Sequence, residues 1–159
     1  MPRLSKAAAQ ERKARIVALA EKRFVQNGYE QSTVDEIVKE IGLAKGTYYY
    51  HFDSKEDLMI AVSEKLILET STKLNAVYTQ KDKDIVWRIR NVLKTYQDDF
   101  YRNKGIWRQV YHWRNAMLYH RVAHISAQRF TPILEDLLAE ASREGKVEIP
   151  HPHEAAESL

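Results

Sequence analysis

The side chains best suited to binding chemistry are gathered between Thr33 and Lys55. After Ala44, a glycine, a threonine, tyrosines and basic residues follow one another within about two helical turns. A glycine lets backbone approach a base, a threonine can touch a thymine methyl, and basic groups pair with phosphate. A helix that enters the major groove of DNA needs this combination. The residues expected to contact DNA are Thr33, Lys45, Gly46, Thr47, Tyr49, Tyr50, His51 and Lys55.

Two short helices and a tight turn must position these side chains. Thr33 and Glu36 form a Thr-x-x-Glu capping box that predicts a helix start at Thr33. Gly42 is expected to end this helix, because glycine readily adopts the left-handed cap conformation. The next helix is expected from about residue 44 to 52. Its inward side should carry residues spaced by four, namely Ala44, Tyr48 and Phe52.

The remainder of the chain also has helical periodicity, so we expect an all-α fold. Pro132 predicts a kink or restart in a long helix, and Pro152 begins the first turn of another. We expect residues 1–53 to form a three-helix DNA-binding domain with a helix-turn-helix. Residues 54–159 are expected to form a helical ligand-binding and dimerisation domain that is truncated at its C-terminus. The other helices are expected at about 8–27, 54–78, 85–100, 106–113 and 115–144.

Residues from about Lys13 to Ser63 resemble the DNA-binding domain of tetracycline-repressor (TetR) family transcriptional regulators. The resemblance implies an all-helical, dimeric regulator that usually represses transcription until a small molecule binds its C-terminal domain. It places the eight predicted contact residues at DNA-contact positions, and Tyr48 and Phe52 at core positions. The residues that carry it are Phe24, Gly28, Tyr29, Thr33 to Ile37, Gly42 to Phe52, and Lys55 to Leu58.

Aromatic side chains are frequent in the second half of the chain, where the family has an inducer cavity. Ligand pockets are typically apolar and aromatic, although aromatic residues at helical spacing are also ordinary core. His120 and His124 are one helical turn apart, but a metal site would need a third ligand, so we expect no metal and no cofactor. The candidate pocket residues are Trp87, Tyr96, Phe100, Trp107, Tyr111, Trp113 and Met117.

Composition, apolar run length and charge distribution narrow the class of protein further. The chain has 159 residues, no cysteine, and no apolar run of about 18 residues, so we expect a cytoplasmic protein without a membrane span. Residues 1–55 hold 10 Lys and Arg against 7 Asp and Glu, which places the whole net charge of +3 there. The leading hypothesis is a homodimeric repressor, released from a palindromic double-stranded DNA operator by a small-molecule effector. The alternatives are an effector-independent DNA-binding regulator and a helical enzyme; no catalytic motif supports the enzyme.

Overall fold

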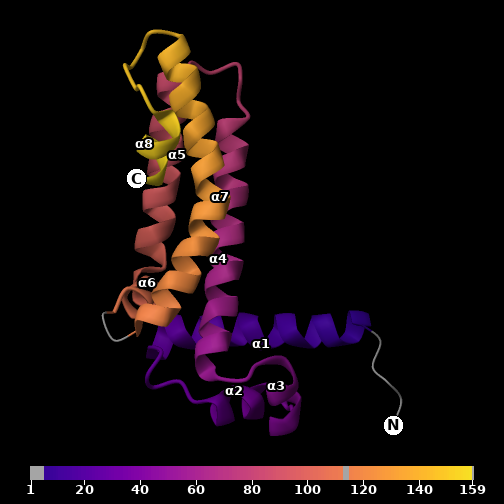
Figure 1. Cartoon of the computed structure of the whole chain (residues 1–159). Coiled ribbons are helices and arrows are strands. Elements are labelled where there is room, and N and C mark those ends of the chain that lie inside the picture. Colours follow the sequence, from indigo (N-terminus) through magenta and orange to yellow (C-terminus); the bar gives the residue numbers. More distant parts are fainter. Residues whose placement is uncertain (1–5, 113–114, 159) are drawn as a thin grey trace. The chain divides into compact units, whose positions relative to one another are not determined.

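The computed structural model describes residues 6–112 and 115–158, and every regular element within them is a helix. The predicted all-α fold class is therefore confirmed (Figure 1). No helix in the described part of the chain is long and apolar enough to cross a membrane. The helices are α1 (Lys6–Asn27), α2 (Val34–Ile41), α3 (Lys45–His51), α4 (Lys55–Tyr78), α5 (Ile85–Arg102), α6 (Lys104–Val110), α7 (Ala116–Arg143) and α8 (Pro152–Glu157).

Two helices differ from the sequence-based expectation. α6 begins at Lys104, so the expected break at residues 103–105 is shorter than predicted, with Asn103 capping the end of α5. Pro132 lies inside α7, which continues as one helix rather than restarting. A proline removes one helical hydrogen bond. Burial of Ile133 and Leu137 directly after it, in the core that also contains Leu74 of α4, offsets this cost.

The chain divides into two compact units, and neither is one continuous segment. Unit 1 contains residues 1–63 and 105–118, and unit 2 contains residues 64–104 and 119–159. The boundary expected between residues 53 and 54 therefore does not coincide with a boundary between these units. The first turns of α4, together with α6, belong to the same compact unit as α1, α2 and α3.

Unit 1 is built on amphipathic helices whose apolar faces are buried. Ile16, Ala20 and Phe24 recur at helical spacing on α1 and are almost completely buried. The other helices of the unit add further buried side chains: Ile37 and Val38 of α2, Tyr48 of α3, Leu58, Met59 and Val62 of α4, and Ile106, Trp107 and Val110 of α6.

Unit 2 combines an apolar core with buried charge pairs. Its core contains residues from α4, α5 and α7: Leu74, Ile85, Val92, Ile133, Leu137 and Ala141. Arg88 is only 2% exposed, and its guanidinium forms a two-pronged ion pair with the Glu140 carboxylate. Asp99 of α5 accepts hydrogen bonds from the Thr70 hydroxyl and the Lys73 ammonium of α4. These contacts tie the three long helices of unit 2 together.

Candidate DNA-binding surface

The helix-turn-helix begins with the predicted capping box. The Thr33 hydroxyl oxygen accepts a hydrogen bond from the Glu36 backbone N–H at 3.2 Å, and the Glu36 carboxylate accepts one from the Thr33 N–H at 3.0 Å. Gly42 then ends α2 with φ +72°, and the next N–H, of Leu43, bonds back to the Val38 carbonyl at 2.9 Å. Both local predictions, the start at Thr33 and the stop at Gly42, are confirmed.

The inner side of α3 is fixed by two aromatic residues. Tyr48 is fully buried, and its hydroxyl donates a hydrogen bond to the Ser54 carbonyl at 2.9 Å. Phe52 is 4% exposed and caps the end of α3. The prediction that Ala44 also faces inward is wrong. Ala44 is the N-cap, with extended backbone (φ −71°, ψ 144°), so the four-residue helical spacing does not reach it and its side chain is exposed.

The outer side of α3 carries most of the predicted contact residues. Tyr49 is 50% exposed and Tyr50 is 75% exposed. Gly46 is exposed, and a Cβ added there would meet no atom within 4 Å. Thr47 is half-buried. Tyr49 contacts the Tyr48 ring and Tyr50 contacts the His51 ring, yet at least half of each tyrosine stays exposed. This surface has the composition that a DNA groove accepts.

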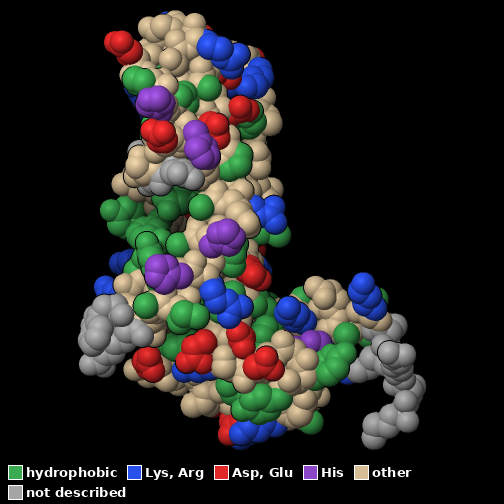
Figure 2. Space-filling view, in the orientation of Figure 1, with side chains coloured by type: hydrophobic (Ala, Val, Ile, Leu, Met, Phe, Trp, Pro, Cys, Tyr) green, Lys and Arg blue, Asp and Glu red, His purple; other side chains and the backbone are tan. Residues whose placement is uncertain are grey.

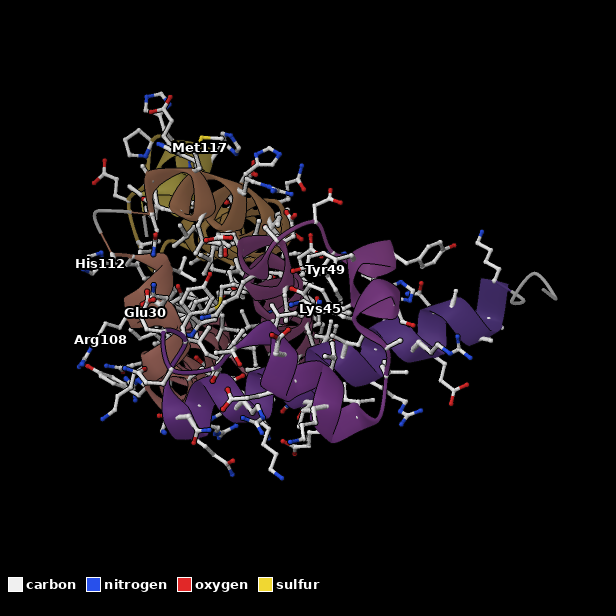
Figure 3. The ribbon with its side chains drawn as sticks, turned by 90° about the horizontal axis from the view of Figure 1, so that it is seen from below. Glu30, Lys45, Tyr49, Arg108, His112 and Met117 are labelled. Carbon is white, nitrogen blue, oxygen red and sulfur yellow. The ribbon has the colours of Figure 1, made fainter. Side chains whose placement is uncertain are left out.

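Two of the predicted contact residues already interact with the first turn of α2. The Lys45 ammonium lies 2.7 Å from the Asp35 carboxylate, and this pairing raises the pKa of Lys45. The Thr33 hydroxyl donates to the Glu36 carboxylate at 2.9 Å. Figure 3, which views the molecule from below, shows Lys45 and Tyr49 as neighbours. A phosphate at Lys45 or Thr33 would compete with these carboxylates.

Lys55 lies against the turn between α1 and α2. Its ammonium is 4.1 Å from the centre of the Tyr29 ring and 3.4 Å from the Glu30 carbonyl oxygen, to which it donates. Burial lowers the pKa of Lys55. Tyr29 in turn packs edge-on against the core residue Phe24. Lys55 thus links the start of α4 to the α1–α2 turn. This structural role was not predicted from the sequence.

His51, at the end of α3, has an electrostatic environment that depends on α1. Burial lowers its pKa first, and the positive charges of Lys13 and Arg12 lower it further. The imidazole therefore favours its neutral form, which can donate one hydrogen bond and accept another. From the sequence alone, these α1 cations contribute only to the basic bias of residues 1–55. Their position one helical turn before the buried Ile16 and Val17 was the signal that they face the interior side of α1.

The candidate pocket residues are distributed over both units. Trp107, Tyr111 and Met117 belong to unit 1, whereas Trp87, Tyr96 and Phe100 belong to unit 2. Trp107 is buried, Met117 is 77% exposed, and Tyr96 packs edge-on against Phe130. Trp113 lies outside the described residues. Their role in ligand binding stays a prediction.

Unit 1 also contains a cavity that the sequence did not indicate. Its volume is about 330 Å³, and it is lined by Glu30, Gln109, His112 and Asn115. The Gln109 amide donates to the Glu30 carboxylate at 3.1 Å, which joins α6 to the α1–α2 turn. Among the described residues, no three His, Asp or Glu side chains are grouped so as to hold a metal ion.

Comparison with known proteins shows that this surface is similar to that of a known family. Residues 16–62 match the model of bacterial regulatory proteins of the tetR family. The HTH-type transcriptional regulator QacR of Staphylococcus aureus is 42% identical over 50 residues, which cover 31% of this chain and 27% of QacR. The curated matches span only 23% to 31% of those relatives' own lengths.

Two solved structures share the fold over most of this chain. One is a TetR/AcrR-family transcriptional regulator from Thermobifida fusca, with a TM-score of 0.71 and 24% identity, covering 93% of this chain and 79% of that protein. The other is the regulator FadR of Bacillus subtilis in complex with stearoyl-CoA, with a TM-score of 0.74 and 23% identity, covering 91% and 78%. The sequence match includes the capping box, the Gly42 turn and the whole of α3. This DNA-binding region, residues 16–62, is therefore similar to that of the tetR family of bacterial regulatory proteins.

Proposed function

We propose that this chain represses transcription by inserting α3 into the major groove of a palindromic operator. The observation that carries the proposal is the division of α3 into two sides. Tyr48 and Phe52 are buried and fix the helix, while Gly46, Tyr49 and Tyr50 remain exposed beside it. In a helix-turn-helix the second helix reads base edges in this way. Thr33, Lys45, Thr47, His51 and Lys55 complete the proposed contact set.

Substitutions on the two sides of α3 should separate binding from folding. Tyr50→Ala and Gly46→Glu should abolish operator binding, because the first removes an exposed groove contact and the second adds a bulky anion there. Neither should change the free energy of unfolding by more than about 0.5 kcal/mol, because both positions are exposed. Tyr48→Phe should instead cost about 1 kcal/mol of stability, because it removes the hydrogen bond to Ser54.

The measurement begins with selection of bound DNA from a random pool by the full chain. Fluorescence-anisotropy titration of the selected sequence then gives the affinity of each variant, and urea denaturation gives its stability. Unchanged affinity in both α3 surface variants would refute the assignment of this helix. A selected sequence without two-fold symmetry would contradict the palindromic operator.

The proposal includes a small-molecule effector and a homodimer in the full-length protein. FadR of Bacillus subtilis is described in complex with stearoyl-CoA, which supports a ligand site in a helical domain of this kind. A palindromic operator requires two recognition helices related by two-fold symmetry, and a dimer supplies them. An effector would act by binding more tightly to a conformation that fits the operator poorly. Since bacterial DNA lies in the cytoplasm, we place this function there.

The alternatives remain distinguishable by experiment. An effector-independent regulator would bind the operator equally well in the presence of any ligand that binds the purified protein. A helical enzyme would turn over a substrate. The relatives found by comparison are named transcriptional regulators, which supports the prediction that the chain is not an enzyme.

A further inference from the structure

Three cations near the helix-turn-helix already have partners within unit 1. Arg23 pairs with Glu40 at 2.5 Å, Lys45 pairs with Asp35, and Lys55 lies on the Tyr29 ring. Charges that are paired in this way offer little to an incoming polyanion until the pair is broken. The residues of α1 that lie before its buried segment differ from them.

Arg12 and Lys13 have no carboxylate partner among the residues that the structure describes. Both lie one helical turn before Ile16 and Val17, so they extend the buried side of α1 beyond the end of the core. The Lys13 ammonium lies 5.6 Å from the centre of the Phe52 ring, at the C-terminal end of α3. Figure 1 shows α3 close to the N-terminal part of α1, and Figure 2 shows Lys and Arg side chains on this arm of α1.

Two cations without a carboxylate partner among the described residues therefore adjoin the end of the proposed recognition helix, and one of them, Lys13, lies over the Phe52 ring. Their side chains are half-buried, so their aliphatic stems lie on protein while their charged ends remain available to solvent. A groove-binding helix brings phosphates of both strands alongside it, within reach of groups that flank its ends. A neighbouring cation gains more from such a phosphate when no carboxylate has to be displaced first.

We propose that Arg12 and Lys13 bind DNA phosphates, so that the DNA-binding surface extends from α3 onto the N-terminal half of α1. This inference rests on the proposed function, because it assumes that α3 enters the groove. It adds two contact residues that lie outside the helix-turn-helix. Both contacts are independent of sequence, because phosphates carry no base information.

The alternative is that these cations only stabilise α3. A positive charge near a helix C-terminus interacts favourably with the helix dipole, typically by less than about 1 kcal/mol. The two roles differ in their salt dependence. A phosphate contact releases condensed counterions, so each one adds about 0.9 to the slope of log affinity against log salt concentration. A dipole interaction within the protein adds nothing to that slope.

The test compares Arg12→Gln, Lys13→Gln and the double variant with the unaltered chain, using the selected DNA and a scrambled duplex at several salt concentrations. Each single substitution should weaken binding to both duplexes alike, by roughly fivefold near physiological salt, and reduce the salt slope by about one. Arg12→Lys and Lys13→Arg should restore the slope. Lys22→Gln is the matched control: Lys22 is exposed, and nine residues place it on about the opposite side of α1 from Lys13.

NMR titration of His51 provides a readout that does not depend on DNA. Its pKa should rise in the Gln variants, since Arg12 and Lys13 both lower it in the unaltered chain. An unchanged salt slope in the double variant would overturn the inference, whether or not the His51 pKa rises. A loss of affinity for the selected duplex alone, with an unchanged salt slope, would also overturn the inference. It would show that Arg12 and Lys13 act by positioning α3. If the unaltered chain selects no DNA at all, the proposed function fails first.

Discussion

The two compact units use their charged side chains differently. In unit 2 the principal ion pairs each contain one buried side chain and join separate helices: the buried Arg88 of α5 pairs with Glu140 of α7, and the buried Asp99 of α5 pairs with Lys73 of α4. In unit 1 the pairs are more exposed, as between Lys45 and Asp35, and Arg12 and Lys13 of α1 have no carboxylate partner among the residues that the structure describes. Unit 2 therefore commits its charges to holding helices together, whereas unit 1 leaves charges and aromatic rings available at its surface.

This difference suggests separate roles for the two units: the charges of unit 2 stabilise the fold, and those at the surface of unit 1 are available to bind a ligand. A buried ion pair is costly to break from one side, because the remaining charge is left without a partner in a poorly solvated place. An exposed pair contributes little to stability and can exchange its partner for a ligand. Substitutions in unit 2 should therefore change stability, and substitutions on the surface of unit 1 should change binding.

The largest effect is expected at Arg88. Replacement by Met leaves the Glu140 carboxylate with only Lys81 as a partner, so we expect a loss of about 3 kcal/mol in the free energy of unfolding of unit 2. Hydrogen exchange followed by mass spectrometry would measure this loss separately for each unit. Arg90→Met on the same helix is the control, because Arg90 is exposed and should change stability by less than about 0.5 kcal/mol. If Arg88→Met and Arg90→Met changed the free energy of unfolding equally, the ion pair of Arg88 would not stabilise unit 2 as we expect.

A smaller effect is expected from acid. Hydrogen bonding and charge from Arg88, followed by Lys81, lower the pKa of Glu140 to about 2. A carboxyl group with a lowered pKa stabilises the fold above its unfolded pKa, and this contribution disappears as the pH falls through the folded pKa. Unit 2 should therefore lose on the order of 2 kcal/mol between about pH 4.5 and pH 2. Urea denaturation across this range would measure it, and Glu140→Gln should flatten the dependence. An equally steep dependence in that variant would assign the acid sensitivity to other groups.

The smallest effect is expected at the exposed pair of unit 1. Asp35→Asn should change stability by less than about 0.5 kcal/mol, because both partners are largely exposed. It should nevertheless raise DNA affinity a few-fold, since Lys45 no longer has to leave a carboxylate and one anion is removed from the surface. Anisotropy titration would detect this gain, which should vanish in the Lys45→Gln background. A loss of affinity would show instead that Asp35 holds Lys45 in its binding position.

Local features of the helix-turn-helix could be predicted from the sequence. The capping box at Thr33, the stop at Gly42, and the buried Tyr48 and Phe52 each depend on residues within a few positions of one another. The failure at Ala44 has the same origin: the spacing rule holds only within a helix, and Ala44 lies one residue before α3 begins. The exposure of Tyr49 and Tyr50 on α3 followed from their spacing relative to Tyr48, whereas their contact with DNA stays a prediction.

Features that depend on distant contacts could not be predicted in this way. The contact of the Lys55 ammonium with the ring of Tyr29, 26 positions earlier in the chain, had no local signal, and the predicted phosphate contact of Lys55 stays a prediction. The charges that act on His51 come from α1, and α6 belongs to unit 1 although about 40 residues of unit 2 precede it. Nothing in the local pattern around these residues identifies their partners.

The sequence by itself determined the helical class, the two helices of the helix-turn-helix and the similarity of residues 16–62 to the tetR family, because helical periodicity, caps and a long motif are encoded in neighbouring residues. Tertiary structure alone decided which charges are engaged and which are available. Whether a lysine meets a carboxylate, an aromatic ring or open solvent depends on side chains that folding brings together from distant segments. For that reason the proposed extension of the DNA surface onto Arg12 and Lys13 could be inferred only once α1 was seen beside the end of α3.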